Sequence, residues 1–374
     1  MENSDKIIKV QGVFKHYDWG GKTFLPRLLN RSNEEGKRYA EYWLGSDLHE
    51  AAGKLPYLFK VQDVEKMLSI QVHPSKEVAE RKFNEENERG IPLDAPNRSY
   101  RDDNHKPELL SPLGDFYLLH GFKQVEQIRK TLADTPELAF LGESFKGGDY
   151  RRLYTKVMTI PQPEVNRILM PLINRILPEY NAGKLSKDDP SFWAARAYAT
   201  FNSGENIDRG IFSIYLFNIV HMTEGEALFQ DAGLPHAYLE GHTMEIMANS
   251  DNVLRGGLTP KHVDVPELLE NILFEPTVPN IIKGSAGRTS EEIFETPARD
   301  FQLSRIIIQP LQGISLVAFR PDIYFVYEGH GHAVADELSV TFRSGDALMV
   351  FPGTAVHLNT DDRAILYRAS VPSS

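Results

Sequence analysis

The stretch from about Phe301 to Val371 restricts the possible folds of this chain more than any other feature of its sequence. It contains many short apolar runs, and a turn signal separates each run from the next. The turn signals are Gln312-Gly313, Arg320-Pro321, Glu328-Gly329, Ser344-Gly345 and Pro352-Gly353. Short strands separated by turns at such regular spacing are typical of antiparallel sandwiches. The sequence therefore predicts a β-sandwich or jelly roll at this end of the chain.

The earlier part of the chain alternates between β and helical patterns. Residues 7–73 contain short β-type runs separated by Gly, Pro and Asn clusters, which indicates antiparallel strands. The charged stretch Ser75 to Gly90 predicts a solvated helix that forms an outer flap and stops at Gly90. From about Gln124 to Tyr215, apolar residues recur every three or four positions, which predicts a helical insertion.

Short strands return after the predicted insertion. They are expected at Leu216 to Gln230 and at Ala237 to Met247, and Glu240-Gly241 predicts a turn. A chain of 374 residues exceeds the usual size of a single domain, so two domains, or one domain with a large insertion, are expected.

The chain has no cysteine, although its composition, 41% hydrophobic and 25% charged, is that of an ordinary globular protein. The absence of thiols excludes disulfides, thiolate nucleophiles, iron–sulfur clusters and thiolate zinc sites. Any bound metal must therefore use nitrogen and oxygen ligands. A formal net charge of −11 disfavours nucleic acid and anionic membranes, although a local basic pocket could still bind a phosphorylated small molecule.

No segment of the sequence predicts a membrane span. The first residues, MENSDKIIKVQG, contain no apolar stretch of signal-peptide length. The longest nearly apolar run, Phe212 to Val220, is too short to cross a bilayer. We therefore expect a cytoplasmic protein without nucleic acid or membrane partners, and we expect a monomer.

The C-terminal stretch resembles the cupin jelly roll at two places. Tyr327-Glu328-Gly329 matches the end of the first cupin signature, and Gly345-Asp346 with Pro352 and His357 matches the second. The positions of the cupin carboxylate and histidines hold Asp322 and the segment Leu316 to Arg320 instead. This sandwich is therefore expected to bind no metal. His330 and His332 follow the closing glycine, and we expect them on an outer turn at the surface.

An earlier part of the sequence carries a more complete ligand pattern. Gln71 and His73 stand two residues apart at the end of a strand-like run, so their side chains point the same way. Glu108 follows after the flap, and Pro235-His236 ends a second signature stretch. Two imidazoles, one carboxylate and one amide oxygen suit Zn²⁺ with coordination positions left open, as a catalytic site requires. Each residue taken singly could be a satisfied polar group beside a β core; their joint placement favours a metal site.

Three longer motifs resemble the signatures of the type I mannose-6-phosphate isomerases, a cupin family. They are Leu68-Ser69-Ile70-Gln71-Val72-His73-Pro74, Asn104-His105-Lys106-Pro107-Glu108 and the segment SDNVLRGGLTPK that begins at Ser250. Tyr17-Asp18-Trp19-Gly20 and Ala40-Glu41-Tyr42-Trp43-Leu44-Gly45 also fit this family. The resemblance implies interconversion of mannose 6-phosphate and fructose 6-phosphate, by proton transfer between C1 and C2 through a cis-enediol, with one bound zinc.

Matched residue by residue, the resemblance places the four zinc ligands on Gln71, His73, Glu108 and His236. It also places the essential arginine on Arg255, which would stabilise the developing oxyanion. A salt bridge from Arg255 to Asp251 is the structural alternative.

The proton carrier is left open between Lys106 and Glu245, with His105 as a third candidate, because Lys106 could instead only balance Glu108. The expected substrate contacts are Ser69, Lys60 and Lys261 for the phosphate, and Tyr238, Trp19 and Asp251 along the sugar pocket. Tyr238 and Trp19 could equally be core residues, and the three phosphate candidates could be solvated at the surface.

The expected fold class is mainly β: a bicupin of two jelly-roll sandwiches with a helical insertion. We expect residues 1–122 and 216–285 to form a catalytic zinc-binding domain, residues 123–215 the insertion, and residues 286–374 a metal-free sandwich. The same fold leaves two other functions open, a bicupin metal oxygenase and a non-catalytic sugar-phosphate-binding bicupin.

Overall fold

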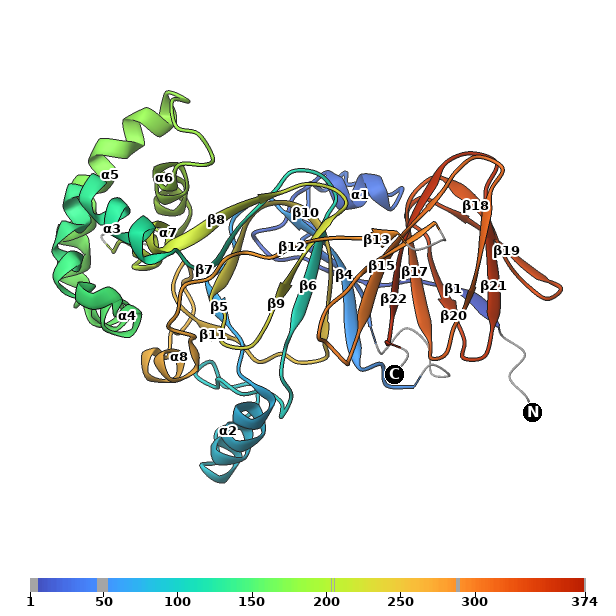
Figure 1. Cartoon of the computed structure of the whole chain (residues 1–374), viewed down its shortest axis with the longest axis horizontal. Helices are drawn as coiled ribbons and strands as arrows, with labels where there is room; N and C mark the ends of the chain where they lie inside the picture. The colour runs from blue at the N-terminus through green and yellow to red at the C-terminus, as the bar shows by residue number, and fades with distance from the viewer. Residues whose placement is uncertain (1–5, 46–52, 203, 205, 287–289, 373–374) are drawn as a thin grey trace.

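The computed structural model describes residues 6–45, 53–202, 204, 206–286 and 290–372. The chain forms a row of layers, with helices at one end and a β-sandwich at the other (Figure 1). Two β-sandwiches and a helical segment inserted in the sequence of the first sandwich confirm the expected fold class. None of the helices in the described ranges has the length and apolar character needed to span a bilayer.

The helical layer confirms the insertion that the sequence predicted. Its helices are α3 Val125–Asp134, η3 Pro136–Glu143, η4 Lys146–Gly148, α4 Tyr150–Thr159, α5 Gln162–Asn181, α6 Pro190–Phe201 and α7 Gly210–Leu216. Apolar residues of α5 at three- and four-residue spacing, such as Val165, Leu169 and Leu172, are buried in one core with α8 Val265–Asn271. That core also contains side chains from the neighbouring sheet, so the helices stabilise the outer face of that sheet.

The sheet beneath the helices belongs to the first sandwich. It consists of β5 Gln71–Val72, β7 Phe116–Phe122, β8 Phe217–Met222, β11 Leu254–Arg255 and the first part of β10 His236–Ala248. The facing sheet consists of β2 Val13–Lys15, β3 Glu41–Leu44, β4 Tyr57–Val64, β6 Glu108–Pro112, β9 Glu226–Gln230, β12 Ile281–Lys283 and the second part of β10. Strand β10 therefore runs through both sheets and joins them.

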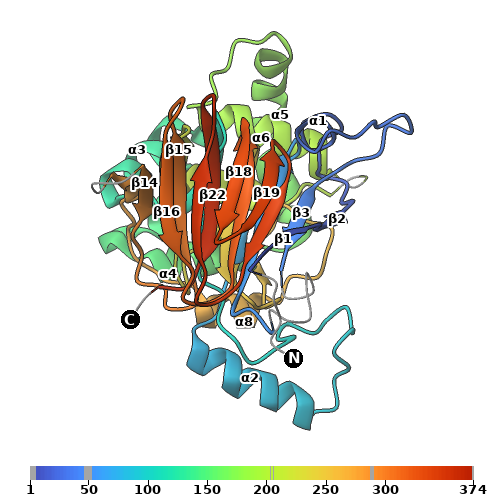
Figure 2. The ribbon, with the colours of Figure 1, turned by 90° about the vertical axis from the view of Figure 1, so that its right-hand side faces the viewer.

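The second sandwich lies on the far side of this facing sheet (Figures 1 and 2). Its inner sheet has the strand order β1 Ile7–Val10, β20 Ala347–Val350, β17 Asp322–Glu328, β22 Ala364–Ser370, β15 Gln302–Ile308, β14 Glu291–Phe294, β13 Ser285–Ala286. Its outer sheet has the order β16 Gly313–Val317, β21 Ala355–Asn359, β18 His330–Ala335, β19 Leu338–Arg343. The predicted turn dipeptides separate these strands, which confirms the jelly-roll expectation for this region.

Two short helices lie outside the layers. Helix α1 Phe24–Leu28 follows β2, and helix α2 Lys76–Glu88 projects from the body of the molecule (Figures 1 and 2). The Ser75 side chain caps α2 by accepting a hydrogen bond from the Val78 N–H, and the chain leaves the helix before Gly90 at φ +68°. The solvated helix predicted for Ser75 to Gly90 is confirmed.

Three details differ from the sequence-based expectations. Glu240-Gly241 lies inside the single long strand β10, directly after a β-bulge between Tyr238 and Glu240, and is not a turn between two strands. His330 and His332 are exposed as expected, but they lie within strand β18 and not on an outer turn. Strand β1 pairs with β20, so the first strand of the chain lies in the C-terminal sheet and not with the domain to which residues 1–122 were assigned.

Candidate metal centre and surrounding cavity

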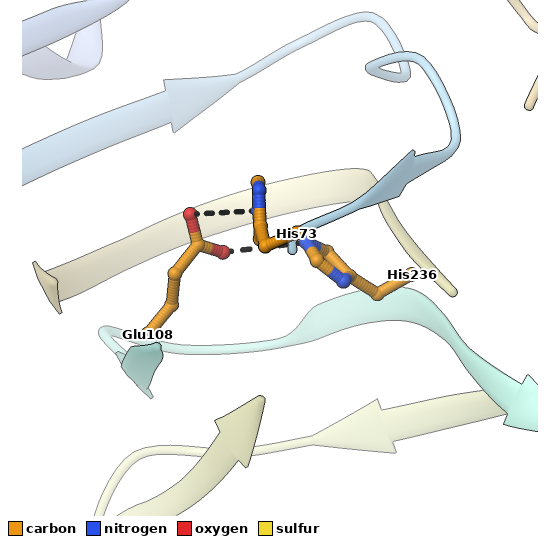
Figure 3. A group of neighbouring side chains, drawn as sticks. All are labelled: His73, Glu108 and His236. Atoms are coloured by element: carbon orange, nitrogen blue, oxygen red, sulfur yellow. Dashed lines mark ion pairs between the residues drawn. The ribbon is translucent and has the colours of Figure 1, made fainter. Parts of the chain in front are cut away.

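Three of the four predicted ligands converge inside the first sandwich (Figure 3). His73 follows β5, Glu108 is the first residue of β6, and His236 is the first residue of β10. One potential ligand atom from each residue lies within 4.8 Å of the others. The two Glu108 oxygens lie 3.3 Å from His73 Nε2 and 3.3 Å from His236 Nε2. All three side chains are buried.

The hydrogen bonds on the far sides of the two imidazoles fix which nitrogens face the carboxylate. His73 Nδ1 lies 2.8 Å from the Asn252 carbonyl, and His236 Nδ1 lies 2.9 Å from the Leu234 carbonyl. A carbonyl only accepts, so each Nδ1 carries the proton and donates it. In a neutral imidazole the lone pair then lies on Nε2, and both Nε2 atoms face Glu108.

This arrangement fits a cation. Burial and the nearby Lys106 ammonium lower the pKa of His73 to about 4, so its imidazole is neutral at pH 7. Among the described residues, its buried Nε2 has no hydrogen-bond partner. The neutral Nε2 atom of His73 and the Glu108 oxygen 3.3 Å away are both hydrogen-bond acceptors, and no hydrogen lies between them. A divalent cation resolves this conflict, and neutral imidazoles with one carboxylate form a donor set that suits zinc.

Gln71 lies next to this group. On β5 it is paired with His236 of β10 on one side and with Arg255 of β11 on the other. Its side chain contributes to the same cavity as Glu108 and His236. The amide oxygen of Gln71 is therefore available as the fourth ligand that the sequence pattern indicated.

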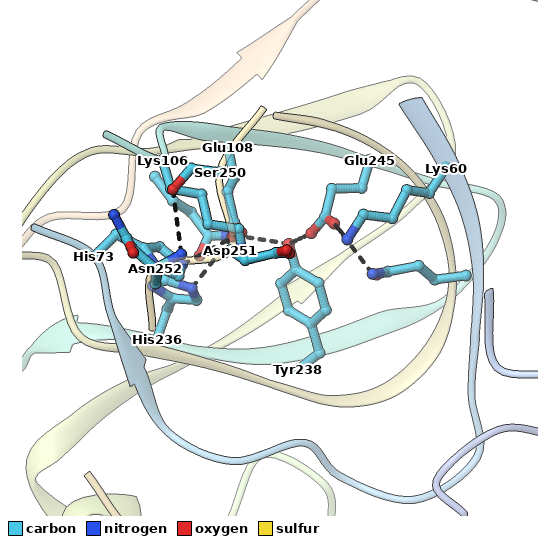
Figure 4. A network of polar contacts seen from close by, with 12 residues as sticks. Lys60, His73, Lys106, Glu108, His236, Tyr238, Glu245, Ser250, Asp251 and Asn252 are labelled. Atoms are coloured by element: carbon cyan, nitrogen blue, oxygen red, sulfur yellow. Dashed lines mark hydrogen bonds and ion pairs between the residues drawn. The ribbon is translucent and has the colours of Figure 1, made fainter. Parts of the chain in front are cut away.

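A cavity of about 200 Å³ opens in front of the candidate metal ligands Glu108 and His236. Its lining includes most of the predicted catalytic and substrate residues: Trp19, Lys60, Lys106, Tyr238, Glu245, Asp251 and Lys261. These residues come from strands and loops far apart in the sequence, and Figure 4 shows Lys60, Lys106, Tyr238, Glu245 and Asp251 around one polar network. The predicted candidates are thus gathered at one place.

The bulge in β10 explains how one strand supplies residues to this cavity from both of its parts. Before the bulge, His236 and Tyr238 face the cavity, while Ala237 and Leu239 pack in the helical core. Glu240 also points outward, where it pairs with Lys187 and Arg196 of the helical insertion. Leu239 and Glu240 thus both point away from the cavity. The inward and outward alternation of side chains along β10 therefore shifts by one residue at the bulge, and Glu245 faces the cavity.

A buried network surrounds Lys60 at one end of the cavity (Figure 4). Lys60 Nζ lies 2.7 Å from Glu245 and 3.4 Å from Glu41. Gln62 Nε2 donates to both carboxylates, at 2.8 Å to Glu41 and 3.1 Å to Glu245. The Tyr238 hydroxyl donates to the other Glu245 oxygen at 2.5 Å. One ammonium and two neutral donors thus hold two buried carboxylates together.

Burial and charge act against each other in this network. Burial alone would lower the pKa of Lys60, but the carboxylates of Glu245 and Glu41 raise it above its usual value. Burial raises the pKa of the Glu245 carboxyl, while the Lys60 ammonium opposes that shift. Burial and the Glu245 carboxylate raise the pKa of Tyr238 well above its usual value. Lys60 is therefore a cation at pH 7, and the carboxylates of Glu41 and Glu245 balance its charge.

Lys106 lies at the metal end of the cavity. Its Nζ is 2.9 Å from Glu108 Oε1, which agrees with the alternative that Lys106 balances the charge of Glu108. Burial would raise the pKa of Glu108, but Lys106 and His73 hold it well below its usual range. Glu108 is therefore an anion at pH 7, which is the form that a metal ligand must have.

Four predicted site residues remain: Arg255 and Lys261, which are partly buried cations near each other, and Ser69 and His105, which do not line the cavity. Burial lowers the pKa of Arg255 and of Lys261, and Arg101 adds to both shifts through its charge. Within the described ranges no ion pair joins Arg255 to Asp251. Ser69 does not contribute to the cavity lining, and His105 is bound to Asp300 at 2.9 Å.

Sequence reasoning gave no role to Glu41, Gln62 or Trp43. Glu41 and Gln62 stand opposite each other on β3 and β4, and Glu41 also accepts a hydrogen bond of 2.7 Å from Trp43 Nε1. The only signal in the sequence was the segment from Ala40 to Gly45, which fitted the family without indicating what its residues do. The register of β3 against β4 creates this contact, and local sequence does not encode that register.

The fold and the buried ligand group in the first sandwich define a class of protein, the cupin-type metal enzymes. Residues 48–125 match a family model described as phosphomannose isomerase type I, catalytic domain. A mannose-6-phosphate isomerase from Salmonella typhimurium is 32% identical over 379 residues, covering 91% of this chain and 94% of that protein. Mannose-6-phosphate isomerase 2 from Arabidopsis thaliana is 31% identical and covers 100% of this chain and 95% of that protein.

Solved structures agree with these matches. A crystal structure of mannose 6-phosphate isomerase from Salmonella typhimurium, bound to its substrate fructose 6-phosphate and to zinc, has a TM-score of 0.85. It is 29% identical and covers 98% of this chain and 100% of that chain. The chain belongs to the mannose-6-phosphate isomerase family.

Proposed function

We propose that this chain interconverts mannose 6-phosphate and fructose 6-phosphate with one zinc ion held by Gln71, His73, Glu108 and His236. The observation that carries the proposal is the pair of imidazole Nε2 atoms turned toward one buried carboxylate beside a polar cavity. Family membership supplies the substrate class. When bound, zinc polarises a sugar oxygen as a Lewis acid.

The side chains of the cavity account for the remaining steps. Two buried groups, Lys106 and Glu245, can carry the proton between C1 and C2, because both line the cavity. The Tyr238 hydroxyl orients Glu245 through the 2.5 Å hydrogen bond. We propose that Arg255 adds a fixed positive charge near the developing oxyanion.

The phosphate of the substrate requires a cationic side chain that is not already paired with a carboxylate. Lys60 is close to two carboxylates, so we propose that it fixes Glu245 and does not hold the phosphate. Lys261 has no carboxylate partner among the described residues, and it lies near Arg255 and Arg101. We therefore propose the Lys261 end of the cavity as the phosphate subsite. Ser69 stays a prediction without support from the cavity lining.

A coupled isomerase assay combined with metal analysis tests the function. The purified protein is expected to contain one zinc per chain and to convert fructose 6-phosphate to mannose 6-phosphate. Chelation should abolish the conversion, and added zinc should restore it. A zinc-loaded sample without activity contradicts the proposal. Iron content with oxygen uptake would instead favour an oxygenase, since two histidines and one carboxylate also suit non-haem iron.

Two variants distinguish the proton carriers. Replacing the residue that moves the proton should lower kcat by about 10² to 10⁴-fold. Lys106→Met and Glu245→Gln are therefore compared at saturating zinc and substrate, with zinc content measured in both. The variant that keeps its zinc and loses turnover identifies the carrier.

Three further expectations stay proposals. We propose a monomer, because one chain supplies every residue that lines the cavity, and sedimentation velocity tests it. We propose the division into a catalytic domain, a helical insertion and a metal-free C-terminal sandwich, which limited proteolysis tests. We propose a cytoplasmic location, which cell fractionation tests.

A further inference from the structure

Asn252 is fully buried, and its side-chain amide binds the loop of residues 101–104 with both of its polar atoms. Asn252 Oδ1 accepts hydrogen bonds from the backbone N–H groups of Arg101 at 2.7 Å and Asp102 at 3.3 Å. Asn252 Nδ2 donates to the carbonyls of Asp102 at 2.8 Å and Asn104 at 2.9 Å. The amide therefore fixes the backbone of this loop in both directions.

The backbone carbonyl of Asn252 has a different partner. It accepts the 2.8 Å hydrogen bond from His73 Nδ1. This bond keeps the proton on Nδ1 and directs Nε2 toward Glu108, which is the role of a carbonyl behind a metal-binding histidine. Figure 4 shows Asn252 beside His73 in the same network as Glu108 and Asp251.

Asp102 completes the connection from the other side. Its carboxylate accepts hydrogen bonds from Ser250 Oγ at 2.7 Å, from the Asp251 N–H at 2.7 Å and from Asn252 Nδ2 at 3.2 Å. Residues 101–104 and 250–252 thus form one hydrogen-bonded unit. Ser250 and Asn252 are the buried members of this unit, and breaking a bond to either of them leaves a buried polar group unpaired, which favours a single arrangement.

This unit lies between two groups of site residues. Lys106 and Glu108 follow directly after residues 101–104, while Asp251 and Arg255 belong to the segment that contains Asn252. Asn252 is not among the residues that line the cavity. Its connections nevertheless reach both ligand-bearing segments and the imidazole of His73.

We propose that Asn252 is a positioning residue, which aligns His73 with Glu108 and holds the segment carrying Asp251 and Arg255 against the metal centre. The inference rests on the proposed role of His73 as a zinc ligand. Replacement of Asn252 removes its side chain and leaves the backbone carbonyl in place. Any loss of zinc affinity must therefore come from displacement of the segment that bears the carbonyl.

The test is the zinc affinity of Asn252→Ala, measured with Zn²⁺ alone by competition with a chromophoric chelator. Loss of a residue that orients a metal ligand weakens binding by about 10- to 100-fold, and we expect a loss in this range. The matched control is Asn166→Ala on α5. Asn166 Oδ1 accepts hydrogen bonds from the Ile207 N–H at 3.0 Å and from Gln162 Nε2 at 2.8 Å, both within the helical insertion. The control should lower the melting temperature and leave zinc affinity unchanged.

A second measurement separates positioning from general stability. At saturating zinc, Asn252→Ala should keep a lowered kcat, because Asp251 and Arg255 are displaced as well. An Asn252→Ala protein with wild-type zinc affinity and kcat overturns the inference, even if its melting temperature falls. Absence of zinc binding by the wild-type chain would instead contradict the proposed function.

If Asn252→Ala does not fold, Ser250→Ala tests the same inference. It removes the hydroxyl that donates to Asp102 and that accepts the 3.2 Å hydrogen bond from the Asn252 N–H. We expect a smaller loss of zinc affinity of the same kind. Unchanged zinc affinity in folded Ser250→Ala would then count against the inference.

Discussion

At the scale of single residues, Lys60 shows how a buried charge can be structural inside the cavity beside the candidate metal centre. Its side chain is 7% exposed and lies within 3.4 Å of two carboxylates. Removing one partner of a buried ion pair leaves an uncompensated charge, which is more costly than loss of a surface pair. The sequence placed Lys60 among phosphate contacts, whereas its surroundings favour a role in holding Glu245.

We predict that Lys60→Met lowers the free energy of unfolding by about 3–5 kcal/mol, because Glu41 and Glu245 lose their common cation. Urea denaturation at pH 7 measures this change. The control is Lys130→Met, which breaks a pair with Asp134 on an exposed helix face and should cost at most about 0.5 kcal/mol. Equal effects of the two substitutions would show that the Lys60 network contributes nothing specific.

At the scale of secondary-structure elements, the bulge in β10 decides which residues reach the site. Gly241 adopts φ +125° beside the bulge, and a Cβ atom there would lie 2.5 Å from the Asp115 carbonyl oxygen. Only glycine fits both the backbone conformation and the close approach. The bulge then directs Glu245 into the cavity.

We predict that Gly241→Ala destabilises the protein by about 2–4 kcal/mol, since a backbone clash is added to conformational strain. It should also lower kcat, because Glu245 moves with the second part of β10. Gly90→Ala is the control: its φ is +68°, but a Cβ atom there meets nothing within 4 Å. The control should cost about 1 kcal/mol and leave kcat unchanged. A kcat for Gly241→Ala equal to that of the control would contradict this role of the bulge.

Glu240, directly after the same bulge, connects β10 to the helical insertion. It forms ion pairs with Lys187 and Arg196. Burial would raise the pKa of Glu240, but these two cations lower it below the usual value. A carboxyl with a lowered pKa in the folded state stabilises the protein above its unfolded pKa of about 4.3, and this contribution is lost as pH falls.

We therefore predict that Glu240→Gln costs about 1.5–3 kcal/mol at pH 7, and that the difference from wild type shrinks as pH falls below about 4. Denaturation curves of both proteins across this pH range measure the difference directly. Other carboxyls titrate equally in the two proteins, so they cancel. A difference that stays constant with pH would exclude the ionised Glu240 as its source.

At the scale of the whole molecule, the two sandwiches share one apolar core. Side chains from the outer face of the first sandwich, including Tyr57 and Phe59, pack with Phe325 and Tyr367 of the second. The single proton of the buried Tyr57 hydroxyl is shared between the carbonyls of Pro321 at 3.1 Å and Ala369 at 3.2 Å. A shared core of this kind couples the unfolding of both parts.

We predict a single calorimetric unfolding transition for the zinc-free chain. Tyr57→Phe should lower the midpoint of that whole transition, at a cost of about 1–2 kcal/mol for the lost shared hydrogen bond. Differential scanning calorimetry of both proteins tests this. Two resolved transitions, with only one of them shifted in the variant, would show that the sandwiches unfold independently.

Strand types, the helical insertion and the ligand candidates were accessible from the sequence because each depends on local patterns. Turn dipeptides marked the C-terminal strands, and periodic apolar residues marked α5. Strand pairing was not accessible in the same way. The partner of β1 stands more than 330 residues away, at Ala347–Val350, and no local pattern records that distance.

By itself, the sequence determined the chemistry available to the protein: nitrogen and oxygen ligands without thiols, and three candidate ligands that the fold brings within 4.8 Å of one another. Only the tertiary structure decided how that chemistry is arranged. The bulge in β10 brings Glu245 to the cavity, β3–β4 register joins Glu41 to Gln62, and Asn252 lies behind His73. These contacts depend on the register of distant segments, which is fixed by the packing of the whole chain and not by local residue preferences.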